Sequence, residues 1–123
     1  MGADLWVVRL TAAAEADYRQ ILHWTLENFG RVQARTYADT LSAALKALST
    51  GPAIPGVKER TGIGTNIRTL HVAREGRKGR HFVVFRVGNM KGRNVIDVLR
   101  LLHDSMDLGR HLPPAALPGR VPG

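Results

Sequence analysis

The residues of this 123-residue sequence that could support catalysis are an acid, a histidine and a set of arginines in its second half. A metal-free ribonuclease needs a base near the 2′-hydroxyl, an acid at the leaving oxygen and cations around the phosphorane. Glu59 could act as the base and His103 as the acid or base. The candidate cations are Arg60, Arg68, Arg80, Arg86 and Arg100. Binding a phosphate requires less than a full catalytic set, so recognition without chemistry is the preferred interpretation of these arginines.

Other kinds of catalytic or ligand site find little support. The chain has no cysteine, which excludes a disulfide framework, a thiolate zinc site and a cysteine nucleophile. Gly62-x-Gly64 lacks the third glycine and the lysine of nucleotide-binding loops. The histidines lack metal-ligand spacing, so each is expected to be structural or solvated, and we expect no metal and no cofactor. They are His23, His71, His81, His103 and His111.

The net charge of +8 comes entirely from the middle of the chain. Residues 51–100 carry eleven basic and three acidic side chains, whereas the segments on either side are balanced. A one-sided positive field attracts a polyanion or an acidic partner. The predicted sheet offers few aromatic side chains for base stacking, since Phe82 and Phe85 are three apart and point to opposite faces. An acidic protein partner is therefore expected first, and direct nucleic-acid binding second.

The composition predicts a soluble, cytoplasmic protein that does not enter a membrane. Hydrophobic residues make up 44% of the chain, and no apolar run approaches the roughly 20 residues of a membrane span. The N-terminus, with Asp4 and Arg9, does not have the pattern of a secretory signal. Residues 1–111 are expected to form one domain, and the Pro- and Gly-rich residues 112–123 a tail without regular structure.

Hydrophobic periodicity predicts the elements that must position these side chains. Residues 4–10 form a strand, and Thr11 caps a helix that ends at Gly30. A second helix follows at once and ends at residues 49–52, so the two helices fold into a hairpin. The aromatic residues of these helices are expected to make core or hairpin contacts; they are Tyr18, Trp24, Phe29 and Tyr37.

The rest of the chain alternates as three strands joined by short turns. The strands cover residues 67–72, 80–87 and 94–102, and basic turns at 75–79 and 88–93 join them. Short turns force antiparallel pairing. The predicted fold class is therefore α+β, with the order β-α-α-β-β-β and the helical hairpin packed on one face of an antiparallel sheet.

Several strings of residues resemble the ParE branch of the RelE/ParE toxins of bacterial type II toxin–antitoxin modules, often called plasmid stabilisation proteins. The helices contribute Leu10-x-x-x-Ala14-x-x-Asp17-Tyr18-x-x-Ile21 and Gly30-x-x-x-Ala34-x-x-Tyr37. The most specific string is Arg-x-Leu-His-x-x-Met-Asp, from Arg100 to Asp107. The resemblance covers roughly residues 5–108. The run Gly76–Arg80 and the Pro-rich tail do not correspond to the family pattern.

The resemblance implies a growth-inhibiting toxin that binds DNA gyrase, traps its cleaved-DNA state and is not itself an enzyme. It implies a cognate acidic, ParD-like antitoxin that folds along the helical hairpin and the sheet, so the free toxin should expose an apolar patch. We expect partner contacts from both helices and from the arginines of the sheet. These residues are Tyr18, Leu22, Tyr37, Leu41, Arg68, Arg74, Arg80, Arg86 and Arg100.

Two other interpretations stay open at this point. RelE-like relatives cleave mRNA in the ribosome, with sheet arginines or lysines and an acid or base near the C-terminal end, a position that His103 matches most nearly. A ribosome-dependent mRNA endonuclease would then use Glu59, Arg68, Arg86 and His103. The third interpretation is a toxin that has lost activity and persists as an antitoxin-binding or regulatory partner.

Overall fold

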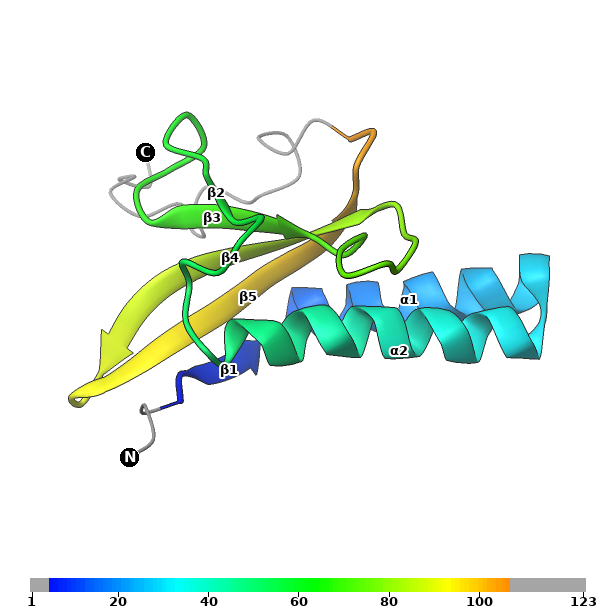
Figure 1. Ribbon diagram of the computed structural model, residues 1–123, viewed down its shortest axis with the longest axis horizontal. Helices are drawn as coiled ribbons and strands as arrows, with labels where there is room; N and C mark the ends of the chain where they lie inside the picture. The colour runs from blue at the N-terminus through cyan, green and yellow to red at the C-terminus, as the bar shows by residue number, and fades with distance from the viewer. Residues whose placement is uncertain (1–4, 107–123) are drawn as a thin grey trace.

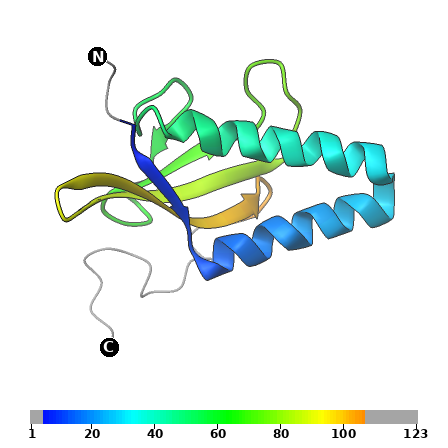
Figure 2. The ribbon, with the colours of Figure 1, turned by 90° about the horizontal axis from the view of Figure 1, so that it is seen from below.

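The two helices begin and end where the sequence supplies capping residues. In the computed structural model, which describes residues 5–106, α1 spans Ala12–Phe29 and α2 spans Arg31–Leu48. The Thr11 side chain accepts a hydrogen bond from the backbone N–H of Ala14 and so caps α1. Gly30, the single residue between the helices, has a φ of +89°, which L side chains rarely adopt. The chain therefore reverses direction within one residue, as Figure 2 shows.

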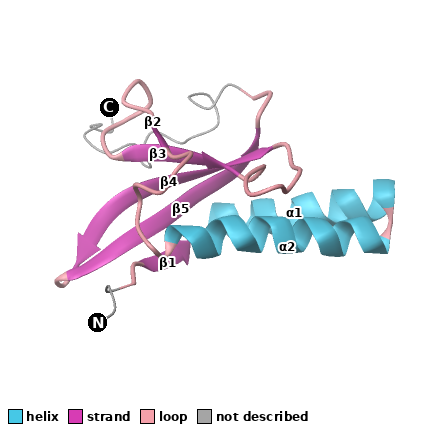
Figure 3. Cartoon of the chain, viewed as in Figure 1, coloured by secondary structure: helices cyan, strands magenta, loops and turns pink. Residues whose placement is uncertain are grey.

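Five strands form one sheet in the order β1-β5-β4-β3-β2, with both helices on one face (Figures 1 and 3). Their bounds are Val7–Leu10 for β1, Lys58–Glu59 for β2, Ile67–His71 for β3, His81–Met90 for β4 and Arg93–His103 for β5. Strands β2 to β5 pair antiparallel, whereas β1 pairs with β5 in parallel. The α+β class and the order of its elements are confirmed, and the parallel edge strand makes the sheet mixed. No helix within the described residues is long and apolar enough to cross a membrane.

Two local features differ from the sequence prediction. The two-residue strand β2 was not anticipated, because Lys58 and Glu59 lie in a segment rich in glycine and proline. The expected six-residue turn at 88–93 was wrong, since β4 and β5 remain paired up to Met90 and Arg93. Only Lys91 and Gly92 form the turn, and both have positive φ, as a two-residue hairpin of this kind requires. Pairing with β5 keeps residues 88–90 in β4 although their residue types favour a turn.

The main core lies between the helical hairpin and the sheet. Leu41 and Leu48 from α2 meet Phe85 from β4 and Ile96 from β5, and each is at most 1% exposed. A second apolar cluster contains Ile67, Val84, Leu99 and Leu102, with Phe82 packed against it. Phe82 and Phe85 thus belong to different clusters, so the sequence correctly placed them on opposite faces of the sheet.

The far end of the hairpin extends past the sheet (Figure 1), and several apolar side chains there are exposed. Trp24 is 58% exposed and Phe29 61%, and their rings pack edge to face with centroids 5.6 Å apart. Leu26 and Val32 beside them are also exposed. Of the expected core or hairpin contacts, Trp24 and Phe29 make the hairpin contact, because the last turn of α1 has no strand to pack against. We call these four residues the hairpin-tip patch; its exposure confirms the expected apolar patch.

A nearly buried ion pair attaches α1 to β5. The Asp17 carboxylate accepts hydrogen bonds from Arg100 Nε at 2.7 Å, from Arg100 Nη2 at 2.9 Å and from the Leu101 backbone N–H at 2.9 Å. The β4–β5 register shifts at this point, with Val84 opposite Arg100 and Phe85 opposite Val98. The hydrogen bond with Asp17 raises the pKa of Arg100 above its ordinary value. Asp17 therefore holds together one helix, one bulged strand and one arginine.

Replacing Asp17 should destabilise the fold strongly. We expect Asp17→Ala to lower the free energy of unfolding by about 3 kcal/mol, because it leaves a half-buried guanidinium and a backbone N–H without their acceptor. Urea unfolding measures the change. The matched control is Glu15→Ala in the same helix, where the ion pair with Arg19 spans 4.0 Å between exposed side chains and is worth less than about 1 kcal/mol. Equally small losses of unfolding free energy in both variants would contradict the structural role given to Asp17.

Candidate functional site

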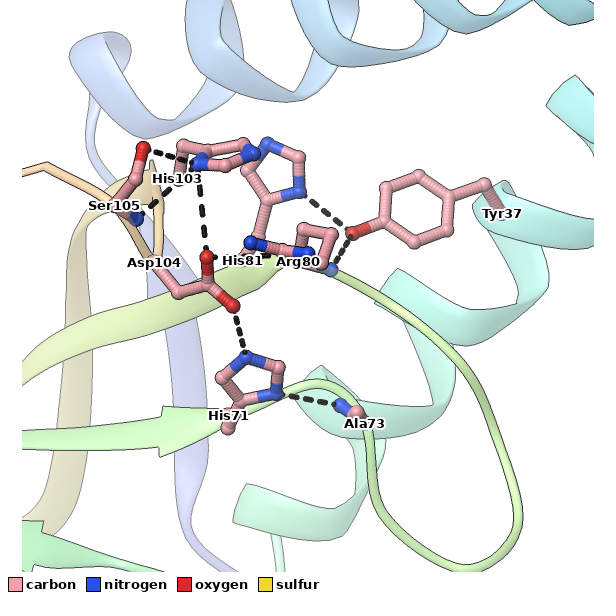
Figure 4. A network of polar contacts seen from close by, with 8 residues as sticks. All are labelled: Tyr37, His71, Ala73, Arg80, His81, His103, Asp104 and Ser105. Carbon is pink, nitrogen blue, oxygen red and sulfur yellow. Dashed lines mark hydrogen bonds and ion pairs between the residues drawn. The ribbon is translucent and has the colours of Figure 1, made fainter.

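Three histidines and one aspartate meet at one end of the sheet (Figure 4). His71 ends β3, His81 begins β4 and His103 ends β5. The register places His81 opposite His103 and Phe82 opposite His71, so the antiparallel pairing brings the three histidines together. Asp104 follows His103 and accepts a hydrogen bond from His71 Nε2 at 3.0 Å. The site is thus assembled by strand ends that lie far apart in the sequence.

Backbone contacts define the hydrogen-bonding role of two of these rings. His71 Nδ1 accepts a hydrogen bond from the Ala73 N–H at 3.0 Å, so its Nε2 carries the hydrogen that is donated to Asp104. His103 Nδ1 accepts from the Ser105 N–H at 3.2 Å and lies 2.7 Å from Ser105 Oγ. Both rings therefore present Nδ1 as an acceptor, the arrangement of a neutral imidazole.

His81 is linked to the second helix through Tyr37. The Tyr37 oxygen accepts a hydrogen bond from the Arg80 N–H at 3.1 Å and lies 2.6 Å from His81 Nδ1, to which it donates its hydrogen. Burial, and next the nearby His103, lower the pKa of His81 to about 4. Burial also raises the pKa of Tyr37. With this lowered pKa His81 is neutral near pH 7, and its Nδ1 accepts the Tyr37 hydrogen in the contact between α2 and β4.

Asp104 is the anion of the site. The hydrogen bond from His71 lowers the pKa of its carboxyl group, and Arg80 Nε, which donates to Oδ1 at 3.2 Å, contributes in the same direction. Within residues 5–106 the structure contains no group of three or more His, Asp or Glu side chains arranged to hold a metal. Chemically, the site is a set of three imidazole rings around one carboxylate that joins β3, β4, β5 and α2.

The four residues considered for ribonuclease chemistry are not brought together. Glu59 pairs with Arg68 at 3.6 Å on the β2–β3 edge, and Arg86 pairs with Asp97 at 3.7 Å. Glu59 is three strands away from β5, which is about 14 Å at the usual strand spacing. His103 lies a further five residues, or about 16 Å, along β5 from the residue level with Glu59. One substrate phosphate cannot contact both the base and the acid in this arrangement.

The residues expected to contact a partner divide into surface and interior positions. Leu41 is 1% exposed and belongs to the core, so its side chain is not available to a partner. The Arg100 side chain is 25% exposed and is held by Asp17. Arg68 donates to the Pro52 carbonyl at 2.9 Å and is also held within the fold. Every one of the expected contact positions except Leu41 retains some accessible surface.

Sequence reasoning missed His71, His81 and Asp104 as members of one site. Each histidine was judged alone as structural or solvated, and the three in this cluster do have structural hydrogen bonds, but their meeting in one place was not foreseen. His111 lies outside the described residues. The signal that could have found them was their position at the ends of three consecutive predicted strands. Antiparallel strands joined by short turns place the end of one beside the start of the next.

The pKa of His81 predicts acid sensitivity in a defined pH window. An unfolded histidine has a pKa near 6.5 and folded His81 about 4, so the stability that His81 provides is complete above pH 6.5 and is lost as the pH falls toward 4. The loss amounts to roughly 3 kcal/mol at most. We expect His81→Asn, which keeps an acceptor for Tyr37 but does not titrate, to flatten this part of the curve of unfolding free energy against pH.

The control for this experiment is His23→Asn. His23 lies on α1 with its side chain 71% exposed, and it contacts Glu27 at 3.0 Å. It should keep the pH dependence of the unaltered protein in urea unfolding between pH 4 and 7. If both variants followed the same curve, the stated role of His81 would be wrong.

Comparison with known proteins agrees with this fold and these elements. The sequence model described as the ParE toxin of the type II toxin-antitoxin system, parDE, matches residues 8–108. Toxin ParE1 of Caulobacter vibrioides is 30% identical over 104 residues, which cover 85% of this chain and 95% of that protein. A solved structure described as the chromosomal ParDE TA system from P. aeruginosa has a TM-score of 0.58 at 20% identity. It covers 82% of this chain and 98% of its own, and it supports the fold alone. The family match spans both helices and the sheet, and on that ground the chain belongs to the ParE toxin family of type II toxin–antitoxin systems.

Proposed function

We propose that this ParE family toxin inhibits growth by binding DNA gyrase and breaks no covalent bond itself. The observation that carries the proposal is the family match over residues 8–108, which includes every described helix and nearly all of the sheet. The geometry supports the same conclusion, because Glu59 and Arg68 pair with each other far from His103. Binding a macromolecule requires only a suitable surface. Catalysis would require free polar side chains, and most of those considered for it are engaged in contacts that hold the fold.

An acidic antitoxin is the partner that a type II toxin requires. We infer that it covers the helical hairpin, where Trp24 and Phe29 expose large apolar surface at the tip. A shallow groove lies nearer the other end of the hairpin, lined by Leu10, Glu15, Tyr18, Arg19, Ser42 and Leu45. Apolar side chains in such a groove suit an amphipathic helix whose other face is acidic. The basic middle segment of the chain adds attraction for that charge.

Purified toxin should inhibit the supercoiling activity of DNA gyrase and accumulate the cleaved-DNA complex. The measurement is a plasmid supercoiling assay with a parallel assay for linear DNA after protein digestion. Heat-denatured toxin serves as the control for loss of the fold and should be inactive. Absence of both effects at micromolar excess of the folded toxin would count against gyrase as the target.

His103→Ala should retain growth inhibition, because a binding mechanism needs no acid or base at this position. Expression without antitoxin in a sensitive host measures toxicity, and sequencing of transcript ends measures RNA cleavage. His23→Ala is the matched histidine control on the exposed face of α1. Transcript cleavage that disappears in His103→Ala but persists in His23→Ala would replace the gyrase proposal by the ribosome-dependent endonuclease.

The hairpin-tip patch should matter for neutralisation and not for folding. We expect Trp24→Ala combined with Phe29→Ala to weaken antitoxin binding by about tenfold or more, because exposed aromatic anchors often dominate interfaces. Isothermal titration with the cognate antitoxin measures this, and the melting temperature should change little. Met90→Ala removes another exposed apolar side chain at the β4–β5 turn and should bind normally. If the unaltered toxin, the double variant and Met90→Ala all bound the antitoxin with equal affinity, the hairpin-tip patch would be excluded from the interface.

A further inference from the structure

The loop between β3 and β4 is the most strongly charged surface segment that the fold leaves unexplained. Residues 73–80, which we call the basic loop, contain four cations and one acid. The cations are Arg74, Arg77, Lys78 and Arg80. The loop includes the run Gly76–Arg80, which corresponds to nothing in the family pattern used above. Its charge therefore needs an explanation of its own.

The basic loop is packed tightly against α2. A Cβ atom on Gly79 would lie 2.5 Å from Val72 Cγ2 and 3.0 Å from the Tyr37 oxygen, so only glycine fits this approach. The Arg80 N–H donates to the same Tyr37 oxygen at 3.1 Å, and Arg77 Nη1 donates to Thr40 Oγ1 at 3.4 Å. These contacts fix the backbone before any ligand arrives, which reduces the ordering cost of binding.

The anchored loop presents its charges outward. The Arg80 side chain is 71% exposed, and Arg77 and Lys78 are exposed as well. Arg74 Nε is buried and has no hydrogen-bond partner among the described residues. The one acid of the loop, Glu75, lies 3.9 Å from Arg74 Nη2. Arg80 also pairs with Asp104 at 3.2 Å, so Arg77 and Lys78 are the cations of the loop whose charge is most available at the surface.

We propose that the basic loop binds the phosphate backbone of duplex DNA. An acidic peptide that orders on binding must bury apolar surface, and the only apolar side chain of the loop is Ala73. Phosphate contacts need only cations and N–H donors, which the loop supplies. The choice of duplex DNA among nucleic acids rests on the proposed function, since gyrase itself binds duplex DNA.

The test measures fluorescence anisotropy of a labelled short duplex of arbitrary sequence as the toxin is added at several salt concentrations. We expect Arg77→Gln combined with Lys78→Gln to weaken binding roughly ten- to a hundredfold near 0.1 M salt. The slope of log affinity against log salt should fall by about 2, because each lost phosphate contact contributes about 0.9. Unfolding curves check that the variant folds.

The matched control is Lys91→Gln combined with Arg93→Gln. It removes the same charge at the opposite end of the β4–β5 hairpin and should keep most of the affinity and of the salt slope. Single-stranded RNA of equal length and polyglutamate complete the comparison as competitors. Equal losses in the two double variants, or stronger competition by RNA or polyglutamate than by unlabelled duplex, would overturn the proposal.

The outcome of this DNA-binding experiment does not depend on whether gyrase is the target. The binding mixture contains no gyrase, so a toxin that binds gyrase through other surfaces would still pass the supercoiling assay while failing here. Conversely, loop-dependent DNA binding with no effect on supercoiling would sustain the basic loop as a DNA contact and remove gyrase as the target.

Discussion

The rest of the structure depends on the pairing of Asp17 with β5. One carboxylate, 8% exposed, satisfies two guanidinium nitrogens and the backbone N–H of Leu101. That N–H lies just after the register shift in β4–β5, where one strand has an extra residue. The bulge and its acceptor require each other, because an unpaired N–H inside the fold would be costly. The position of α1 on the sheet follows from this contact.

The bulge also explains how β5 serves two apolar clusters. Val98 and Leu101, three residues apart, both face the core under the helices, whereas Leu99 and Leu102 both belong to the second cluster. Regular alternation would place residues three apart on opposite faces. The extra residue at the bulge restores the pattern and turns Arg100 toward α1, where Asp17 receives it. Arg100, which the sequence suggested for recognition, thereby serves the structure.

Local signals in the sequence were enough to predict the helices and strands, but not which strands and side chains contact one another. Helix periodicity, the Thr11 cap and the turn at Gly30 depend on neighbouring residues, and each was predicted correctly. The pairing of β1 with β5 joins residues about 88 apart, and no local pattern encodes it. The same holds for the histidine cluster, which depends on the register of three strands. A histidine considered alone was therefore assigned to solvent or core, and its neighbours were missed.

Charge on this chain has two separate uses, and the contacts distinguish them. Arg9 and Arg86 both pair with Asp97, and Arg100 pairs with Asp17, so these cations connect strands and helices. The basic loop instead depends on Gly79 and Tyr37 for its shape and leaves its side chains at the surface. The contacts of Gly79 and of the Tyr37 oxygen do not depend on charge, while Arg77 adds a hydrogen bond to Thr40 and Arg80 pairs with Asp104. Because the uncharged contacts persist when Arg77 and Lys78 are replaced, substitution there should affect binding more than stability.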